Sequence, residues 1–361
     1  MLFRSPVSSS ISVTSPVSPV PSAADDIRAA VRDAGGRIGF DEFMRLALYG
    51  PHGFYGSGGS AGRRGDFITS PEVGPLFGAV LARMLDAEWE RCGRPDGFTV
   101  VDAGAGPGTL ARAVLAASPQ CLANGRYVAV EVSAAQRERH PDGVESVAQM
   151  PARIEAGVII ANELLDNLPF ELWVHDGAWR RATAVERGDG FAEELVAGEP
   201  SFALRPGAPH GARAPVQREA AGWLGGALGS LVRGTVLVID YCTATTVQAA
   251  AMPWREWLRT YAGHERGGHY LREPGTQDIT AQVMVDQLAA VRPPDAVRTQ
   301  EQFLRLWGID ELVEEGRRVW RENAAAPTLA AVRMRSRVAE AEALCDPSGL
   351  GSFGVLEWRA G

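Results

Sequence analysis

Acids and glycines that follow a short apolar run are the residues of this chain best placed to bind a ligand. The run 99–101 leads into Asp102, and Gly104, Gly106 and Gly108 follow at a spacing of two residues. Glycine lets the backbone approach a ligand closely and adopt positive φ angles. A glycine-rich turn between a buried strand and a helix N-terminus is typical of nucleotide sites. We therefore expect Asp102 and the three glycines to contact a nucleotide-like ligand.

The glycine spacing distinguishes between classes of nucleotide. Enzymes that bind dinucleotides carry G-x-G-x-x-G, and the third Gly of that pattern would fall at Thr109. An acid two residues before G-x-G-x-G instead suits a ligand that carries an ammonium group and no pyrophosphate. S-adenosylmethionine (SAM) is such a ligand, and we expect it as the cofactor. A tight strand–helix turn without a ligand is the alternative.

A second acid, Glu131, lies in the β-rich run 126–132. It follows the glycine turn by roughly 20–30 residues, the spacing at which a carboxylate accepts hydrogen bonds from ribose hydroxyls. We expect Glu131 to bind the ribose of the cofactor, with an ordinary exposed glutamate at a strand end as the alternative.

Asn162, Glu163 and Asp166 follow the apolar run 157–161. The ends of parallel strands form the rim of the ligand cleft in a doubly wound sheet. We expect Asn162 to border the cofactor, and Glu163 with Asp166 to face the second substrate. The structural alternatives are an acid that interacts with a helix dipole for Glu163 and a turn acid for Asp166.

A polar loop before Pro71 holds Asp66, Thr69 and Ser70. These three residues are candidates to bind the amino acid end of SAM. Thr69 or Ser70 is also expected to cap the helix that Pro71 begins, and both roles are compatible.

The pattern of apolar runs predicts the sheet that would bring these residues together. Short, largely apolar runs indicate strands buried on both faces, at 98–102, 126–132, 144–147, 157–162 and 235–241, and a final strand is expected at 353–358. Helices are expected at 25–34, 40–49, 75–91, 109–117, 215–231 and 278–291. The expected fold is α/β, a doubly wound, mostly parallel, Rossmann-like sheet of seven strands.

The order of segments predicts three parts. Residues 1–22 are rich in Ser and Pro and are expected to form a disordered tail. Residues 23–95 form a helical segment that lines the cofactor site. Residues 96–361 form the cofactor-binding domain, with a lid-like insertion at about 172–209 and an acceptor-side segment at about 246–300.

Composition excludes several classes of function. The net charge of −8 argues against a broad nucleic-acid or anionic-membrane surface, and no apolar run is long enough to span a bilayer. The chain has no lysine, which excludes Schiff-base chemistry on lysine. Its four cysteines form no C-x-x-C pair, so we expect no metal site and a reducing compartment, the cytoplasm. The Ser-rich, acid-poor start leaves a transit peptide open.

Several motifs together resemble the MidA family of SAM-dependent methyltransferases. Besides the glycine turn, the resemblance rests on segments 40–55, 65–73, 161–169, 240–241, 274–280 and 299–304, in the order of the family. Together they cover about residues 38–358.

The resemblance implies an arginine of a protein as the methyl acceptor. Glu163 and Asp166 would then hold the guanidinium as a pair of carboxylates. Glu171 is a further candidate, because its spacing from Glu163 resembles the two-glutamate loop of protein arginine methyltransferases. Asp278 is the next acid to test.

Three other functions stay open: a methyltransferase that acts on a small molecule, a non-catalytic assembly factor that binds SAM, and a nicotinamide oxidoreductase. The missing third glycine argues against the last of these.

Overall fold

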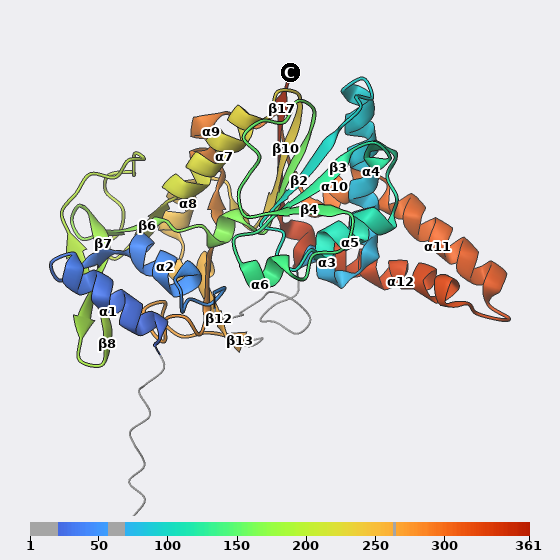
Figure 1. Ribbon diagram of the computed structural model, residues 1–361. Coiled ribbons are helices and arrows are strands. Elements are labelled where there is room, and N and C mark those ends of the chain that lie inside the picture. Colours follow the sequence, from blue (N-terminus) through green and yellow to red (C-terminus); the bar gives the residue numbers. More distant parts are fainter. Residues whose placement is uncertain (1–20, 57–68, 263–264) are drawn as a thin grey trace, which may run out of the picture.

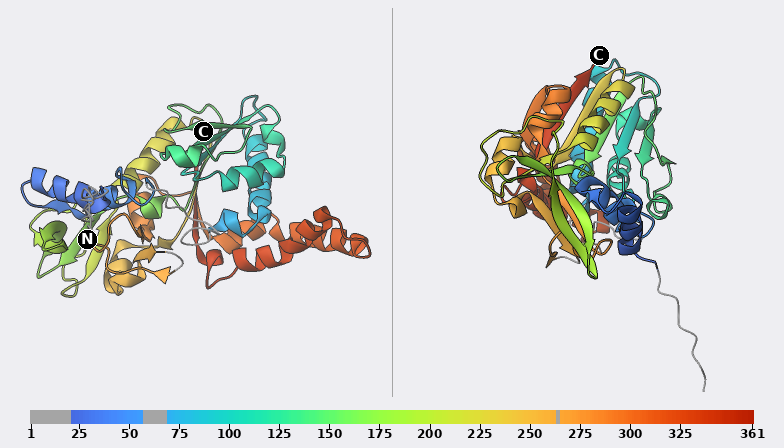
Figure 2. Two further views of the ribbon diagram at one scale, coloured as in Figure 1. Left: turned by 60° about the horizontal axis from the view of Figure 1, so that its bottom comes forward. Right: turned by 90° about the vertical axis from the view of Figure 1, so that its left-hand side faces the viewer.

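The computed structural model describes residues 21–56, 69–262 and 265–361. Within these ranges the chain forms two units that lie side by side, each built on its own sheet (Figures 1 and 2). Most of the predicted tail, and the loop that contains Asp66, lie outside the described residues.

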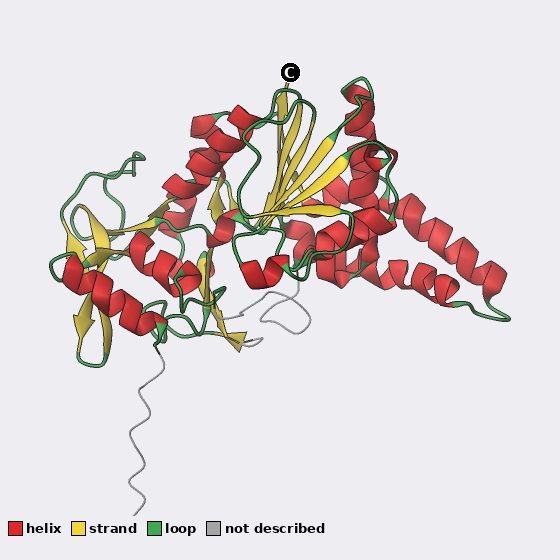
Figure 3. Cartoon of the chain, in the orientation of Figure 1, coloured by secondary structure: helices red, strands yellow, loops and turns green. Residues whose placement is uncertain are grey.

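A seven-stranded sheet forms the centre of the larger unit (Figure 3). Its strands, in spatial order, are β16 (Ala296–Thr299), β17 (Gly354–Ala360), β10 (Gly234–Asp240), β5 (Gly157–Asn162), β2 (Thr99–Ala103), β3 (Arg126–Val130) and β4 (Val144–Val147). The pairs from β10 to β4 are parallel, and β17 is antiparallel to both of its neighbours. The predicted α/β, mostly parallel sheet is therefore confirmed.

Strand β2 lies where the chain order of the sheet reverses. Asp102, near its end, is level with Ala129 of β3 on one side and with Ile160 of β5 on the other. The crevice at such a switch point, outside the carboxyl ends of the strands, is the usual ligand site of doubly wound folds.

Helices cover both faces of this sheet, as its doubly apolar strands require. On one face, α4 (Pro75–Arg91), α5 (Thr109–Ala116) and α10 (Gln300–Leu306) share a core with β2, β5 and β10. On the other face, α7 (Arg218–Ser230) and α9 (Val285–Val291) pack on the same strands and on β17.

The smaller unit is antiparallel and is assembled from distant parts of the chain. Its main sheet contains β1 (Ile38–Gly39), β7 (Trp179–Arg187), β6 (Glu171–His175) and β9 (Arg213–Val216), with β8 (Gly190–Val196) paired to β7. Helices α1 (Ala23–Asp33) and α2 (Phe40–Tyr49) share a core with this sheet and with β12 (Leu258–Ala262) and β14 (Asp278–Ala281).

This second unit corrects two sequence predictions. The segment expected as a lid-like insertion at about 172–209 forms β6 to β8 of a packed sheet. The helix expected at 278–291 begins only at Val285, and residues 278–281 are instead a strand that pairs antiparallel with β12. The residues of β14 are all buried, and β-branched side chains such as Ile279 and Thr280 suit a strand there.

The first helices also divide between the units. α1 and α2 pack in the smaller unit, whereas α4 packs on the central sheet. Ser22, expected in the tail, caps α1: its hydroxyl accepts a hydrogen bond from the Asp25 amide.

Two further helices, α11 (Ile309–Asn323) and α12 (Leu329–Leu344), lie against each other and project from the larger unit (Figure 1). The remaining short elements are α3 (Ser70–Val73), η1 (Gln120–Leu122), α6 (Ala134–Arg137), η2 (Leu165–Asn167), β11 (Cys242–Thr243), α8 (Thr246–Ala251), η3 (Trp254–Glu256), β13 (Glu265–Arg266), β15 (Val283–Met284) and η4 (Leu350–Ser352). In the described ranges, no helix has the length and apolar character needed to cross a membrane.

Candidate active site

A cavity of about 930 Å³ lies at the carboxyl ends of β2, β3 and β5. Of the residues predicted from the sequence, it is lined by Thr69, Asp102, Gly104, Gly106, Glu131, Asn162 and Glu163. Gly108, Ser70 and Asp166 do not line it, and Asp66 lies outside the described residues.

The glycine turn forms one wall of this cavity. Gly104 and Gly106 have φ angles of 71° and 51°, in the left-handed region that side chains with a Cβ rarely adopt. A Cβ on Gly104 would lie 2.9 Å from Leu164 Cδ1, whereas a Cβ on Gly106 would meet no atom within 4 Å. Gly108, also left-handed, is the N-cap of α5, so its role is to start that helix.

Glu131 is held in place by two backbone amides. Its Oε2 accepts from Gly106 N at 3.0 Å and its Oε1 from Ser133 N at 2.8 Å. Each carboxylate oxygen has two lone pairs, so both oxygens can still accept a hydroxyl. The side chain is thus oriented at the cavity wall with capacity for two ribose hydroxyls.

Asp102 is buried at the base of the same wall. Its Oδ2 accepts a hydrogen bond from the Tyr127 hydroxyl at 3.0 Å. Burial raises the pKa of this carboxyl to about 7, although the Tyr127 hydrogen bond opposes the shift. A cationic ammonium beside Asp102 would favour the ionised form, as expected of a residue that binds the amino acid end of SAM.

The polar loop divides its roles. Thr69 lines the cavity as the N-cap of α3, and its amide donates to the Glu72 carboxylate at 3.2 Å. Ser70 is buried behind it, and its hydroxyl donates to Gln300 Oε1 at 2.9 Å. The prediction that Ser70 contacts the cofactor through its side chain does not fit this position, because the hydroxyl already pairs within the protein.

Glu163 is the most constrained residue of the opposite wall. Its φ of 51° lies in the left-handed region, a conformation that costs a non-glycine residue about 1–3 kcal/mol and that recurs at active sites. Its Oε1 accepts from Ser70 N and Asn162 Nδ2, both at 3.2 Å. Its Oε2 is buried without a hydrogen-bond partner among the described residues. Burial, with the nearby Asp166 charge, raises the Glu163 pKa to about 8.

Asp166 lies behind Glu163 and not beside it in the cavity. Its Oδ2 accepts from the Thr280 hydroxyl at 2.6 Å, whereas its Oδ1 has no partner among the described residues. Burial raises its pKa to about 6. The predicted pair is therefore divided: Glu163 reaches the cavity, while Asp166 faces β14.

Two further acids, Asp240 and Asp278, lie near Asp166. Asp240, at the end of β10, accepts hydrogen bonds from the amides of Leu165 and Tyr241 at 3.0 and 2.8 Å. Asp278, at the start of β14, is fully buried, and burial with the Asp166 charge raises its pKa to about 7. We refer to Glu163, Asp166, Asp240 and Asp278 as the acid cluster.

Glu171 does not belong to this cluster. It lies in β6, where it accepts from the Trp173 indole at 3.1 Å and from Arg218 at 3.3 Å. It does not line the cavity. The resemblance to a two-glutamate loop is therefore wrong for this residue, because its carboxylate pairs with Trp173 and Arg218 away from the cavity.

Several residues of the acceptor side are indicated by no sequence pattern. Tyr49, Tyr55 and Asn167 line the cavity, as do Arg45 and Glu219, which form an ion pair. The two tyrosine rings are stacked, with centroids 5.5 Å apart. The motifs that contain Tyr49, Tyr55 and Asn167 were visible, but no spacing rule indicated that these side chains meet.

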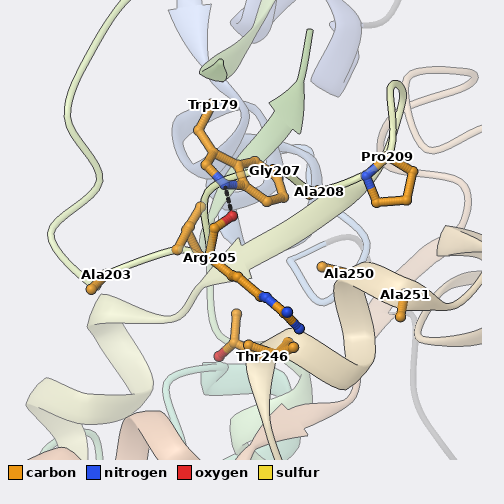
Figure 4. A pocket seen from close by; sticks show the side chains of 11 residues that line it. Trp179, Ala203, Arg205, Gly207, Ala208, Pro209, Thr246, Ala250 and Ala251 are labelled. Carbon is orange, nitrogen blue, oxygen red and sulfur yellow. Dashed lines mark hydrogen bonds between the residues drawn. The ribbon is translucent and has the colours of Figure 1, made fainter. Parts of the chain in front are cut away.

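A smaller cavity of about 250 Å³ lies between the 203–209 loop and α8 (Figure 4). Trp179 borders it and donates to the Arg205 carbonyl at 2.9 Å. It contains none of the predicted site residues, so the chemistry is assigned to the larger cavity.

Comparisons with known proteins identify the family of this chain. The family model described as "Putative S-adenosyl-L-methionine-dependent methyltransferase" matches residues 80–299. A Drosophila melanogaster protein named protein arginine methyltransferase NDUFAF7 homolog, mitochondrial, is 31% identical over 205 residues, 48% of this chain and 47% of the relative. The human protein arginine methyltransferase NDUFAF7, mitochondrial, is 38% identical over 81 residues, 22% of this chain and 18% of the relative.

The chain thus spans less than half the length of these curated relatives. A crystal structure of a Burkholderia thailandensis protein bound to S-adenosyl-homocysteine resembles nearly the whole chain. Its TM-score is 0.75 at 25% identity, with 94% of this chain and 95% of that chain covered. Because the family model spans more than half of the chain, the resemblance to MidA-type enzymes is confirmed, and the chain belongs to this family of SAM-dependent methyltransferases.

Proposed function

We propose that this chain transfers the methyl group of SAM to a guanidinium nitrogen of an arginine in a protein. The observation that carries the proposal is a single cavity with two different walls. One wall holds the glycine turn and Glu131, and the other holds the buried carboxyl of Glu163. The arginine methyltransferase names of the curated relatives support the choice of acceptor.

The first wall would bind and orient the cofactor. Glu131 accepts the ribose hydroxyls, Asp102 accepts the ammonium, and Gly106 lets the backbone lie close to the ligand. When bound, SAM supplies a methyl group on a positively charged sulfur, which is open to in-line attack. Holding the nucleophile and the methyl carbon in line can supply about 7–11 kcal/mol of the barrier.

The second wall would hold the acceptor and receive its proton. A guanidinium is cationic in water, and methylation at nitrogen forms an N–C bond, breaks the S–C bond and releases one proton. Glu163 Oε2, which has no hydrogen-bond partner among the described residues, would take that proton. A raised pKa suits this role, since a base works best when its pKa lies near the working pH.

Incubation with methyl-tritiated SAM and a lysate tests the proposal. We expect tritium in the acid-precipitated protein, and we expect to recover it as methylarginine after the protein is hydrolysed. Label in an extractable small molecule would favour the small-molecule alternative, and no label despite S-adenosyl-homocysteine binding would favour a non-catalytic assembly factor. Binding of NADH in place of S-adenosyl-homocysteine would contradict the cofactor assignment.

The compartment is a separate question. The Drosophila and human relatives are named as mitochondrial proteins. The cytoplasmic location of this chain stays a prediction from its cysteine pattern, and fractionation of the source cells would test it.

A further inference from the structure

The acid cluster contains more unpartnered carboxyl oxygen than a structural role requires. Glu163 Oε2, Asp166 Oδ1 and Asp278 Oδ2 are buried and have no hydrogen-bond partner among the described residues. Asp166 is 3% exposed and Asp278 is 0% exposed. Buried polar groups are almost always paired, so three unpaired oxygens in one place indicate a missing cationic or donor partner.

These three oxygens belong to one site. Asn167, the residue after Asp166, donates to Asp278 Oδ1 at 3.1 Å, and Thr280, two residues after Asp278, donates to Asp166 Oδ2 at 2.6 Å, so these two acids are neighbours. Burial and the charge of Asp166 raise the pKa of Glu163 and of Asp278, as expected if the three carboxyls lie close together. They come from the end of β5, from η2 and from β14. None of the three oxygens pairs with an arginine within the described ranges, and the chain has no lysine.

The cluster is connected to the cavity through its lining residues. Asp278 Oδ1 accepts from the Tyr55 hydroxyl at 3.2 Å and from Asn167 Nδ2 at 3.1 Å. Tyr55, Asn167 and Glu163 all line the cavity. Asp166 and Asp278 do not line the cavity, so a cation in the cavity meets Glu163, Tyr55 and Asn167, and the last two hold Asp278 in place.

Resting on the proposed function, we infer that Glu163 contacts the guanidinium of the acceptor arginine, and that Asp166 and Asp278, which are buried behind the cavity wall, supply the negative charge that makes this end of the cavity selective for a guanidinium. A guanidinium presents five N–H donors in a planar fork, so it can bind the Glu163 carboxyl and other oxygens of the wall at once, whereas an ammonium is a single point charge. Tyr55 and Asn167 position Asp278 behind this wall. Asp240 holds the backbone of η2 and is not a ligand, because its oxygens already accept backbone amides.

Binding of blocked single amino acids to the whole chain tests this inference. The probe is N-acetylarginine amide, titrated at pH 8.5 with and without saturating S-adenosyl-homocysteine. The comparison ligands are the neutral isostere Nα-acetylcitrulline amide and Nα-acetyllysine amide, whose side-chain ammonium is free. We expect the arginine probe to bind at least about 10-fold more tightly than either, since hydrogen bonds to charged groups contribute more than neutral ones.

Two substitutions locate the site. Asp278→Asn is expected to weaken the arginine probe about 10-fold or more while the affinity for S-adenosyl-homocysteine is unchanged. Asp286→Asn is the matched control, because Asp286 pairs with Thr246 and has no contact with the cluster. If Asp278→Asn does not fold, Tyr55→Phe gives the same test through the loss of one hydroxyl, with a smaller loss of affinity.

The outcomes separate this inference from the proposed function. Equal arginine affinity in the wild type and in Asp278→Asn, or equal binding of the lysine and arginine probes, would overturn the guanidinium site. Methylarginine formation could then still stand. Failure of the wild type to bind S-adenosyl-homocysteine would instead contradict the proposed function, while the arginine titration without that ligand still tests the cluster.

Discussion

The two walls of the cavity differ in how their polar groups are satisfied. On the cofactor wall, Glu131 accepts two backbone amides and Asp102 accepts the Tyr127 hydroxyl. On the acceptor side, Glu163, Asp166 and Asp278 each keep one oxygen without a partner among the described residues. Both walls contain buried carboxyls, so burial alone does not explain the difference.

The two walls also differ in how far apart their residues lie in the sequence. The cofactor wall is built from residues 102–133, whereas the acid cluster draws on β5, β10 and β14, and Tyr55 lies 223 residues from Asp278. We infer that the cofactor wall is preorganised by local structure. The acceptor wall stores unfavourable electrostatics that a cationic ligand would relieve.

The largest expected effect breaks the cofactor wall alone. Gly106→Val places a β-branched side chain at a φ of 51°, on the cavity side of the turn. We expect affinity for S-adenosyl-homocysteine to fall more than about 100-fold, which corresponds to about 2.8 kcal/mol. Calorimetry would measure it, with folding checked by circular dichroism.

Gly143→Val is the matched control for Gly106→Val. Gly143 also has a positive φ, of 86°, and open space around a Cβ, but it does not line the cavity. It carries a similar backbone strain, so it should keep the ligand affinity. Undiminished affinity in Gly106→Val itself would remove the glycine turn from the cofactor site.

The second effect acts on the acceptor wall. Glu163→Gln retains an oxygen for Ser70 but loses the group that takes the acceptor proton. We expect turnover to fall about 100-fold or more, with affinity for S-adenosyl-homocysteine unchanged. Asp166→Asn should lower turnover less, because it lies behind the cavity. Wild-type turnover in Glu163→Gln would show that the proton leaves by another route.

The third effect is a pH dependence of stability without ligand. Burial raises the pKa of Asp166 from 3.8 to about 6, of Asp278 from 3.8 to about 7 and of Glu163 from 4.5 to about 8. The folded protein therefore binds more protons than the unfolded chain between about pH 4 and 8, so the free energy of unfolding falls as pH rises through this range. Calorimetric scans should show a Tm that decreases by at least a few degrees from pH 5 to pH 8.

Single substitutions assign this pH dependence to a wall. Asp278→Asn removes one titrating group of the acid cluster and should flatten the fall of Tm. Asp102→Asn makes the same test on the cofactor wall, because burial raises the pKa of the Asp102 carboxyl to about 7. If neither variant changes the slope, the buried carboxyls do not control the stability.

The smallest expected effect lies outside both walls. A chain that starts at Ala23 loses the Ser22 cap of α1, which costs about 1 kcal/mol. A chain that starts at Pro21 keeps the cap and should melt like the full chain. Since α1 packs in the smaller unit, S-adenosyl-homocysteine affinity should be the same in both. A change in that affinity would show that the two units are coupled.

Much of the cofactor wall could be predicted from the sequence alone. Asp102, Gly104, Gly106 and Glu131 line the cavity as expected, and the strands that carry them are close to their predicted bounds. The reason is physical: a strand, a glycine turn and a helix are contiguous, and apolar runs buried on both faces identify parallel strands.

The acceptor wall was decided by tertiary structure. Whether residues 278–281 form a helix or a strand depends on pairing with β12, which local periodicity does not encode. The division between Glu163 and Asp166, and the place of Asp278 beside Tyr55, arise from contacts between segments far apart in the chain. Burial by those contacts raises the carboxyl pKa values, so the chemistry of this wall exists only in the folded protein.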